Sequence, residues 1–251
     1  EDGAKKPEHN FNQENKGKGA ALNAALAQAQ GEYFICMDAD STVQANALRM
    51  MLPYFSRPDV AVVLPCLKVE DSNSNNLIQK MQRYEYIINM FYKELMGRLD
   101  CIHVAPGPFS MYKAAVLKTV GGFDEHNLTE DLEMAIRLQK YHYKLIQTFK
   151  TNVYTIAPGT LKGVYQQRNR WYKGSFLNTL AYKNLIWNKR FGDFGFMQMP
   201  LSLVSGLITL SILLFLIYRL AEPVIRKIYQ WNLIDYDFGP LIQNFVWTYS
   251  L

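Results

Sequence analysis

The chain has 251 residues, enough for one large domain with a buried core and a small additional segment. Its net charge of +5 is mild and its basic residues are scattered, so the composition argues against nucleic acid as a partner. The three cysteines and four histidines lack the spacing of a disulfide framework or a zinc site.

The first predicted helix follows a polar loop at residues 1–15. Alternating Lys and Gly at residues 16–19 lead into an alanine-rich segment that favours a helix ending near Gly31. Lysine and glycine at a helix start can bind a phosphate through charge and backbone N–H groups, and they can equally form a solvated basic loop. Because the chain opens on a loop, we expect it to lack the first strand of an α/β domain.

An unbroken apolar run at residues 33–37 predicts a central strand, buried on both faces as in a parallel sheet. Asp38 and Asp40 follow at its carboxyl end, where open α/β sheets place their ligands. Two carboxylates there repel each other unless a cation or hydrogen-bond donors compensate, and their hard oxygens suit Mg²⁺ or Mn²⁺. Asp235 and Asp237 repeat the D-x-D pattern without such a strand, and we assign them no function.

Helix and strand patterns then alternate along the chain. We expect helices at 48–55, 77–99 and 129–141, and strands at 60–64, 144–149 and 153–156. A stiff Pro-Gly-Pro turn lies at 106–108. The alternation predicts an α/β domain covering residues 1–158.

Asp131 falls in the first turn of the predicted helix that follows Thr129. An acidic residue is favoured there by the helix dipole and by capping, so a structural role is sufficient to explain it. A functional role is also available, in which Asp131 is a general base that takes the proton of an acceptor hydroxyl.

The segment around residue 170 reads Gln-Arg-Asn-Arg-Trp. In a helix, Gln167, Arg170 and Trp171 share one face, which offers an amide, a planar cation suited to phosphate, and a ring that stacks on sugars. Trp171 could instead anchor an amphipathic helix in lipid. With the upstream carboxylates, this face indicates a transferase for a diphosphate-activated sugar.

One membrane-spanning helix is predicted at residues 194–218, which contain no charged residue. At about 1.5 Å per residue the segment reaches roughly 37 Å, more than a hydrocarbon core of about 30 Å. The alternative is a buried core helix.

These motifs, in this order, resemble those of the processive family 2 glycosyltransferases of the GT-A fold, which include cellulose, hyaluronan, chitin and poly-N-acetylglucosamine synthases. The similarity covers residues 15–218. It implies a Rossmann-like α/β nucleotide-sugar-binding domain at 1–158, followed by a region at 159–193 that contains the Q-x-x-R-W motif and an amphipathic interface helix. A transmembrane helix at 194–218 comes next. The remaining segment, 219–251, has room for the start of a second transmembrane helix.

The resemblance also implies the donor site. Asp38 and Asp40 would bind Mg²⁺ or Mn²⁺, while Lys18, Asp38, Gln167 and Arg170 would bind the nucleotide sugar, a UDP-sugar by analogy. The family's first strand, which holds the nucleotide base, has no counterpart here, so we expect donor binding by this chain alone to be incomplete.

On the acceptor side, the resemblance implies that Asp131 is the base and that Trp171 and Gly107 contact the acceptor. The expected activity is inverting transfer of a hexose or N-acetylhexosamine to a growing β-linked polysaccharide, by a membrane protein whose catalytic domain faces the cytoplasm. Two alternatives stay open: a single addition to a lipid-linked acceptor, and a non-catalytic subunit of a synthase complex.

Overall fold

The computed structural model describes residues 15–70 and 76–233, so the second D-x-D, at 235–237, and the segment after it lie outside the described residues. The chain divides into two units, Glu1–Ser202 and Leu203–Leu251, and each is considered by itself.

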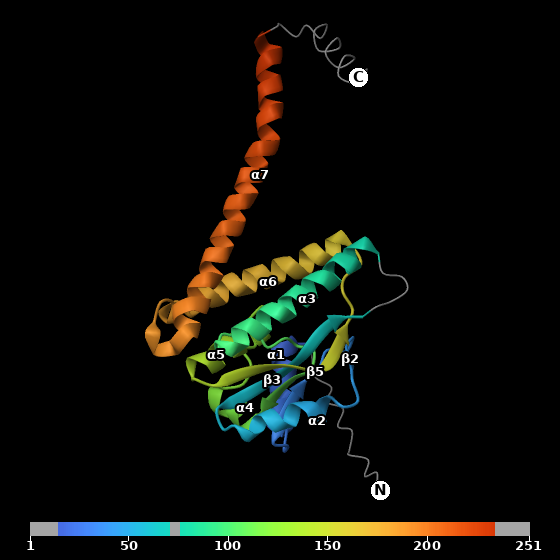
Figure 1. Ribbon diagram of the computed structural model, residues 1–251, viewed down its shortest axis with the longest axis vertical. Coiled ribbons are helices and arrows are strands. Elements are labelled where there is room, and N and C mark those ends of the chain that lie inside the picture. Colours follow the sequence, from blue (N-terminus) through green and yellow to red (C-terminus); the bar gives the residue numbers. More distant parts are fainter. Residues whose placement is uncertain (1–14, 71–75, 234–251) are drawn as a thin grey trace. The chain divides into compact units, whose positions relative to one another are not determined.

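The first unit is built on a five-stranded mixed sheet (Figure 1), whose strands stand in the order β1-β4-β3-β5-β2. Their bounds are β1 Tyr33–Cys36, β2 Thr42–Val43, β3 Val60–Val69, β4 Ser110–Lys113 and β5 Lys144–Thr155. Only β3 and β5 pair in parallel; the β1–β4, β3–β4 and β2–β5 pairs are antiparallel.

Helices cover both faces of this sheet. They are α1 Lys18–Gln28, α2 Ala47–Met51, α3 Leu77–Arg98, α4 Ala114–Val120, α5 Glu130–Lys140 and α6 Leu161–Ala181. One apolar core lies between the sheet and α1, α4 and α5, and a second core lies between the opposite face and α2 and α3. The predicted α/β class is therefore correct.

The apolar run at 33–37 forms β1, but the place of this strand in the sheet differs from the predicted central, parallel one. Phe34 and Cys36 enter the first core while Tyr33 and Ile35 pack against the second, so the strand does contact apolar side chains on both faces. However, β1 is the last strand of the described sheet and its neighbour β4 is antiparallel. Apolar composition reports burial on both faces, which an antiparallel strand between two helical layers also experiences.

The two strands expected between 144 and 156 form one long strand, β5, which follows β3 along its whole length. The pairing shifts register between Leu64 and Cys66, because the segment of β5 opposite them, which includes Lys150, has more residues than β3. Such an irregularity interrupts the alternation of apolar side chains, which is why the sequence pattern divides there.

A helix long enough to cross a membrane follows. A π-helical turn, Phe194–Gln198, leads into α7, Met199–Leu233, and the most apolar 18-residue window of the helical span Phe194–Gln230 has a mean hydropathy of 2.3. None of its most apolar window is buried within the described chain, which does not support the core-helix alternative. By length and composition, α7 can span a bilayer.

The junction before α7 belongs to the first unit. Phe194 and Met199 are almost fully buried in a third apolar cluster with Met96 of α3 and with Leu132 and Ile136 of α5. The first turn of the predicted membrane segment is thus part of the globular core.

Candidate active site

Lys18 connects three elements that are far apart in sequence. Its Nζ lies 2.6 Å from Asp38 Oδ1, in the loop after β1, and 3.5 Å from Glu130 Oε1, at the start of α5. Burial alone would lower the pKa of Lys18, but the hydrogen bond and charge of Asp38, with the charges of Glu130 and Asp131, raise it. The predicted phosphate-binding lysine is thus held as a cation at the carboxyl end of β1.

Gly107 lies against this ion pair. A Cβ at this position would overlap Lys18 Nζ and come within 2.8 Å of both carboxylate oxygens of Asp38. Next to it, Phe109 has a left-handed φ of 57°, and Ser110 Oγ donates a hydrogen bond to Pro106 O. A side chain at this position would therefore have to displace Lys18 Nζ or the Asp38 carboxylate. The structure therefore groups Gly107, an expected acceptor residue, with Lys18 and Asp38.

Asp131 is the second residue of α5, and its Oδ1 accepts a hydrogen bond of 2.8 Å from the Leu132 N–H. The cap position itself is Thr129, whose side chain makes no capping hydrogen bond. Burial, and then the charge of Glu130, raise the pKa of Asp131, while Leu132 N–H, Lys18 and Lys93 oppose the rise. A carboxylate with a raised pKa is a stronger base, as proton transfer at neutral pH requires.

Lys93 lies near the Asp131 carboxylate, and His103 lies near Lys93; sequence reasoning missed both residues. Burial lowers the pKa of Lys93 to about 8, against the charge of Asp131. Burial, and then the charge of Lys93, lower the pKa of His103 to about 4. Neither residue lies in a motif; the packing of α3 on the sheet brings Lys93 near Asp131, and His103 in turn lies near Lys93.

The Arg-Trp face is on α6, as predicted, but its aromatic ring is held by a residue outside the predicted set. The Arg168 guanidinium lies 4.6 Å from the centre of the Trp171 ring, and its Nη2 is 2.7 Å from Glu85 Oε2 on α3. Trp171 also packs against the second core. Arg170 is exposed and forms no ion pair among the described residues, while Gln167 Oε1 is buried there without a hydrogen-bond partner.

Helix α3 lies beside both the region around Asp131 and the Arg-Trp face of α6. Figure 1 shows α3 and α6 running side by side, and the Gln82 amide of α3 donates to Pro158 O just before α6. On α3, Tyr86 is near enough to interact with the charges of Arg168 and Asp40, and Lys93, seven residues later, interacts with Asp131. The inner face of α3 therefore borders the D-x-D loop, the predicted base and the Arg-Trp helix.

Residues 33–246 match the protein-family model described as glycosyl transferase family group 2. The chain belongs to this family.

Two curated members of the family are similar in sequence. The poly-β-1,6-N-acetyl-D-glucosamine synthase of Staphylococcus epidermidis is 30% identical over 181 residues, which cover 68% of this chain and 43% of that protein. The β-monoglucosyldiacylglycerol synthase of Synechocystis is 29% identical over 189 residues, 73% of this chain and 39% of that protein. The chain thus spans less than half the length of these two relatives.

Among solved structures, a mannosyltransferase of Pyrobaculum calidifontis in complex with GDP-mannose and Mn²⁺ is similar with a TM-score of 0.53. It is 17% identical, and the similarity covers 82% of this chain and 60% of that one. At this level of identity the likeness shows the shared GT-A fold.

The family's cation site was predicted at Asp38 and Asp40. Asp38 is engaged by Lys18, while Asp40 is exposed, with Ser41 Oγ 3.5 Å from its Oδ1. The described residues contain no cluster of three or more His, Cys, Asp or Glu side chains that could enclose a metal. Two carboxylates fit a cation that completes its shell with water and substrate phosphate oxygens, which is how Mg²⁺ commonly binds.

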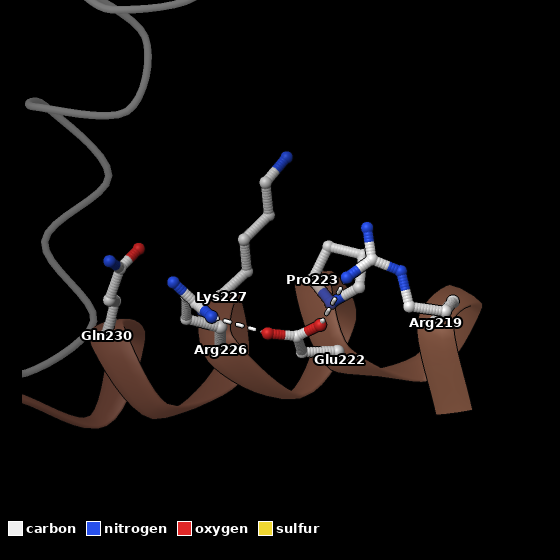
Figure 2. A pocket seen from close by; sticks show the side chains of 6 residues that line it. All are labelled: Arg219, Glu222, Pro223, Arg226, Lys227 and Gln230. Atoms are coloured by element: carbon white, nitrogen blue, oxygen red, sulfur yellow. Dashed lines mark hydrogen bonds and ion pairs between the residues drawn. The ribbon is translucent and has the colours of Figure 1, made fainter. Parts of the chain in front are cut away.

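A hollow on α7 has no catalytic character. Figure 2 shows its lining, with Glu222 Oε1 2.5 Å from Arg226 Nη2 and Oε2 3.6 Å from Arg219 Nη1. Lys227, Pro223 and Gln230 complete it. This cationic group directly follows the uncharged segment 194–218, a composition suited to the headgroup region at the end of a membrane span.

Proposed function

We propose that this chain is the catalytic core of a membrane-associated, inverting glycosyltransferase. It would transfer a hexose or N-acetylhexosamine from a nucleoside-diphosphate sugar, a UDP-sugar, to a growing β-linked glycan. The observation that carries the proposal is the position of Lys18 between Asp38 and Glu130, because it joins the predicted donor-binding loop to the start of the helix that bears the predicted base.

In the proposed reaction, the acceptor hydroxyl loses its proton to Asp131 while its oxygen attacks the anomeric carbon. The bond between that carbon and the diphosphate oxygen breaks, and the nucleoside diphosphate leaves with the bonding electrons. Lys18 and the exposed Arg170 would counter the charge that develops on the leaving group. The raised pKa of Asp131 supports its role as the base.

A divalent cation, Mg²⁺ or Mn²⁺, would be held by Asp38 and Asp40 and would offset diphosphate charge. The pairing of Asp38 with Lys18 supports the view that this carboxylate sits where positive charge is needed. Gly107, which excludes any side chain from the same place, would give the diphosphate room to approach.

The acceptor would stack on Trp171, whose ring is held by Arg168. A second candidate function is a single addition to a lipid-linked acceptor, because one similar protein is a glycolipid synthase. The products separate the two: a polymerase gives a ladder of lengths and a single-addition enzyme gives one glycolipid.

Membrane lipid is a proposed partner of both units. In addition to α7, large apolar side chains are exposed along α3 and α6, including Tyr84, Ile88, Phe91, Tyr172 and Phe176. An exposed apolar surface of this kind fits the membrane interface. By family analogy, the catalytic unit would face the cytoplasm.

The proposed base is tested by Asp131→Asn. Asparagine keeps the size and polarity of the side chain but cannot take the proton, so transfer should fall at least about a hundredfold. Nucleotide-sugar affinity should change little, because the base acts on the acceptor. Retained transfer by this variant would show that Asp131 only supports its helix and that the proton acceptor is another group.

A further inference from the structure

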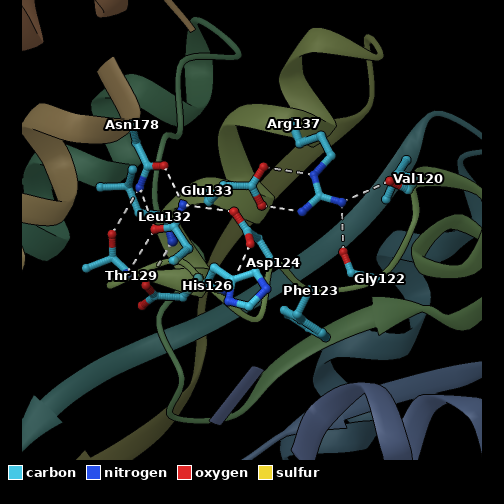
Figure 3. A network of polar contacts seen from close by, with 12 residues as sticks. Val120, Gly122, Phe123, Asp124, His126, Thr129, Leu132, Glu133, Arg137 and Asn178 are labelled. Carbon is cyan, nitrogen blue, oxygen red and sulfur yellow. Dashed lines mark hydrogen bonds and ion pairs between the residues drawn. The ribbon is translucent and has the colours of Figure 1, made fainter. Parts of the chain in front are cut away.

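A buried polar network fastens the start of α5 to α6 (Figure 3). Asn178 of α6 is 2% exposed, and its amide donates to Asn127 Oδ1 and to Thr129 Oγ1, each at 3.1 Å. In return, Asn127 Nδ2 donates to Asn178 Oδ1 at 2.8 Å. The residues before Asp131 are therefore tied to α6 by reciprocal hydrogen bonds in a place with little access to water, where such bonds are difficult to replace.

Shape reinforces the network one turn earlier on α6. A Cβ on Gly174 would overlap Thr129 Oγ1 and lie 2.5 Å from its Cγ2 and 2.9 Å from its Cβ. Thr129 is 4% exposed, and its own N–H donates to Asn127 Oδ1 at 3.1 Å. Thr129 thus fills the gap that the missing side chain of Gly174 leaves, two residues before Asp131.

The next turn of α5 is fixed as well. The buried carboxylate of Glu133 pairs with Arg137 and accepts a hydrogen bond from Tyr182 OH, just beyond α6. Arg137 Nη1 also donates to Val120 O and Gly122 O, at 2.9 and 2.8 Å. The end of α5 that carries Asp131 is therefore held on two sides.

The spacing along α6 gives the network a consequence for the reaction. Arg170, Gly174 and Asn178 are four residues apart and follow one face of the helix, and Trp171 is adjacent to Arg170. The groups proposed to bind diphosphate and acceptor therefore lie on the same rigid element as the groups that hold Thr129. A displacement of about 1 Å between an acceptor hydroxyl and its base can cost roughly a hundredfold in rate.

We propose that Gly174 and Asn178 are positioning residues, which set the place of the Asp131 carboxylate relative to the acceptor bound at Trp171. This inference rests on the proposed function and adds two residues that act through Thr129 and Asn127 rather than by touching substrate. It accounts for a glycine and a buried asparagine on a helix that otherwise presents Arg and aromatic side chains.

The test uses Asn178→Asp and Gly174→Ala in the full chain. The first replaces the donating NH₂ by oxygen at nearly constant shape, and the second adds one methyl group whose three nearest atoms all belong to Thr129. Thr179→Val is the matched control, because Thr179 is 5% exposed on the same helix and, within the described part of the chain, its hydroxyl donates to Ser175 O of α6 rather than to α5.

Three quantities are measured: kcat per UDP-binding site, Kd for UDP, and amide hydrogen exchange of residues 128–134. We expect both variants to lose at least about tenfold in kcat, to keep Kd within about twofold, and to exchange about tenfold faster in that segment. The control should match the wild type in all three. A purely stabilising network would lower the amount of folded protein without changing kcat per binding site.

Two failures are distinguishable. If the wild type transfers sugar and Asp131→Asn still does so, the proposed base is wrong. If Asp131→Asn is inactive but Asn178→Asp and Gly174→Ala turn over at the wild-type rate, or if exchange of residues 128–134 is unchanged, the positioning role is overturned while the base assignment stands.

Discussion

At the scale of single residues, the site depends on one glycine and one lysine. Lys18 pairs with the Asp38 and Glu130 carboxylates, which in the proposed function would otherwise repel an anionic donor, and Gly107 places no side chain against this ion pair. The backbone of Gly107 does not have a positive φ, so this glycine matters because of the atoms beside it.

Replacing Gly107 by alanine is therefore expected to weaken donor binding. The added methyl group would displace Lys18 Nζ or the Asp38 carboxylate, and we expect Kd for the nucleotide sugar to rise at least about tenfold. Titration of the protein with donor measures this. Gly31→Ala is the control, since a Cβ there would meet only backbone of Tyr33, at 3.4 Å or more. Equal donor affinity in both variants would contradict the assigned location of the diphosphate.

Arg168→Lys should act on the acceptor rather than on the donor. Lysine keeps the charge beside Glu85 but loses the planar group that stacks on Trp171. We expect the KM for the acceptor to rise by up to roughly tenfold, while the Kd for the donor stays the same. Steady-state kinetics with varied acceptor measure the change, and Lys173→Gln, an exposed cation on the same helix, is the control. An unchanged KM would mean that Trp171 is held adequately by its core contacts.

At the scale of elements, α3 has a larger part than its sequence indicates. Its sequence indicates an amphipathic helix with no motif, yet Tyr86 and Lys93 on its inner face adjoin the D-x-D loop and the proposed base. Helical periodicity predicts which face is buried, but it does not say which distant residues meet that face. For the same reason, the sequence could not indicate that His103 lies beside Lys93.

His103 gives a prediction for stability against pH. Its pKa is about 4 in the folded chain and 6.5 ordinarily, so the unfolded chain takes up a proton between these values that the folded chain does not. The stabilisation is complete above pH 6.5 and is lost as the pH falls towards 4, by about 2 kcal/mol between pH 7 and 5. His103→Gln should remove this part of the acid sensitivity. Denaturant unfolding in detergent at the two pH values measures it.

Asp131 acts in the opposite direction, because its raised pKa favours the protonated folded form at low pH. The comparison of His103→Gln with the wild type isolates the histidine, since Asp131 is present in both. If the two proteins lose equal free energy of unfolding on acidification, His103 is not held neutral by burial.

At the scale of the whole molecule, the boundary between the globular unit and the candidate membrane helix lies inside a continuous helical segment. Phe194 and Met199 are 2% and 1% exposed in the third apolar cluster, although both fall within the stretch that is apolar enough to span a bilayer. Composition cannot separate apolar side chains that face a protein core from those that face lipid.

Truncation should show where the boundary falls. A chain that ends at Ser202 keeps Phe194 and Met199, and we expect alkaline carbonate to release it from membranes, while the intact chain should require detergent. A chain that ends at Asn188 loses both side chains, each worth about 2–5 kcal/mol in a core, and should aggregate. Release of the intact chain by carbonate would contradict a membrane-spanning α7.

The sequence by itself determined the α/β class, the family, the three motifs and the apolar helix, because propensity, periodicity and short motifs are local properties. Only the tertiary structure decided that β1 pairs in antiparallel fashion with β4, that Gly107 lies against Lys18, and that Asn178 holds Thr129. These contacts join residues separated by tens of positions along the chain. Their geometry follows from how helices pack across the sheet, which no local pattern encodes.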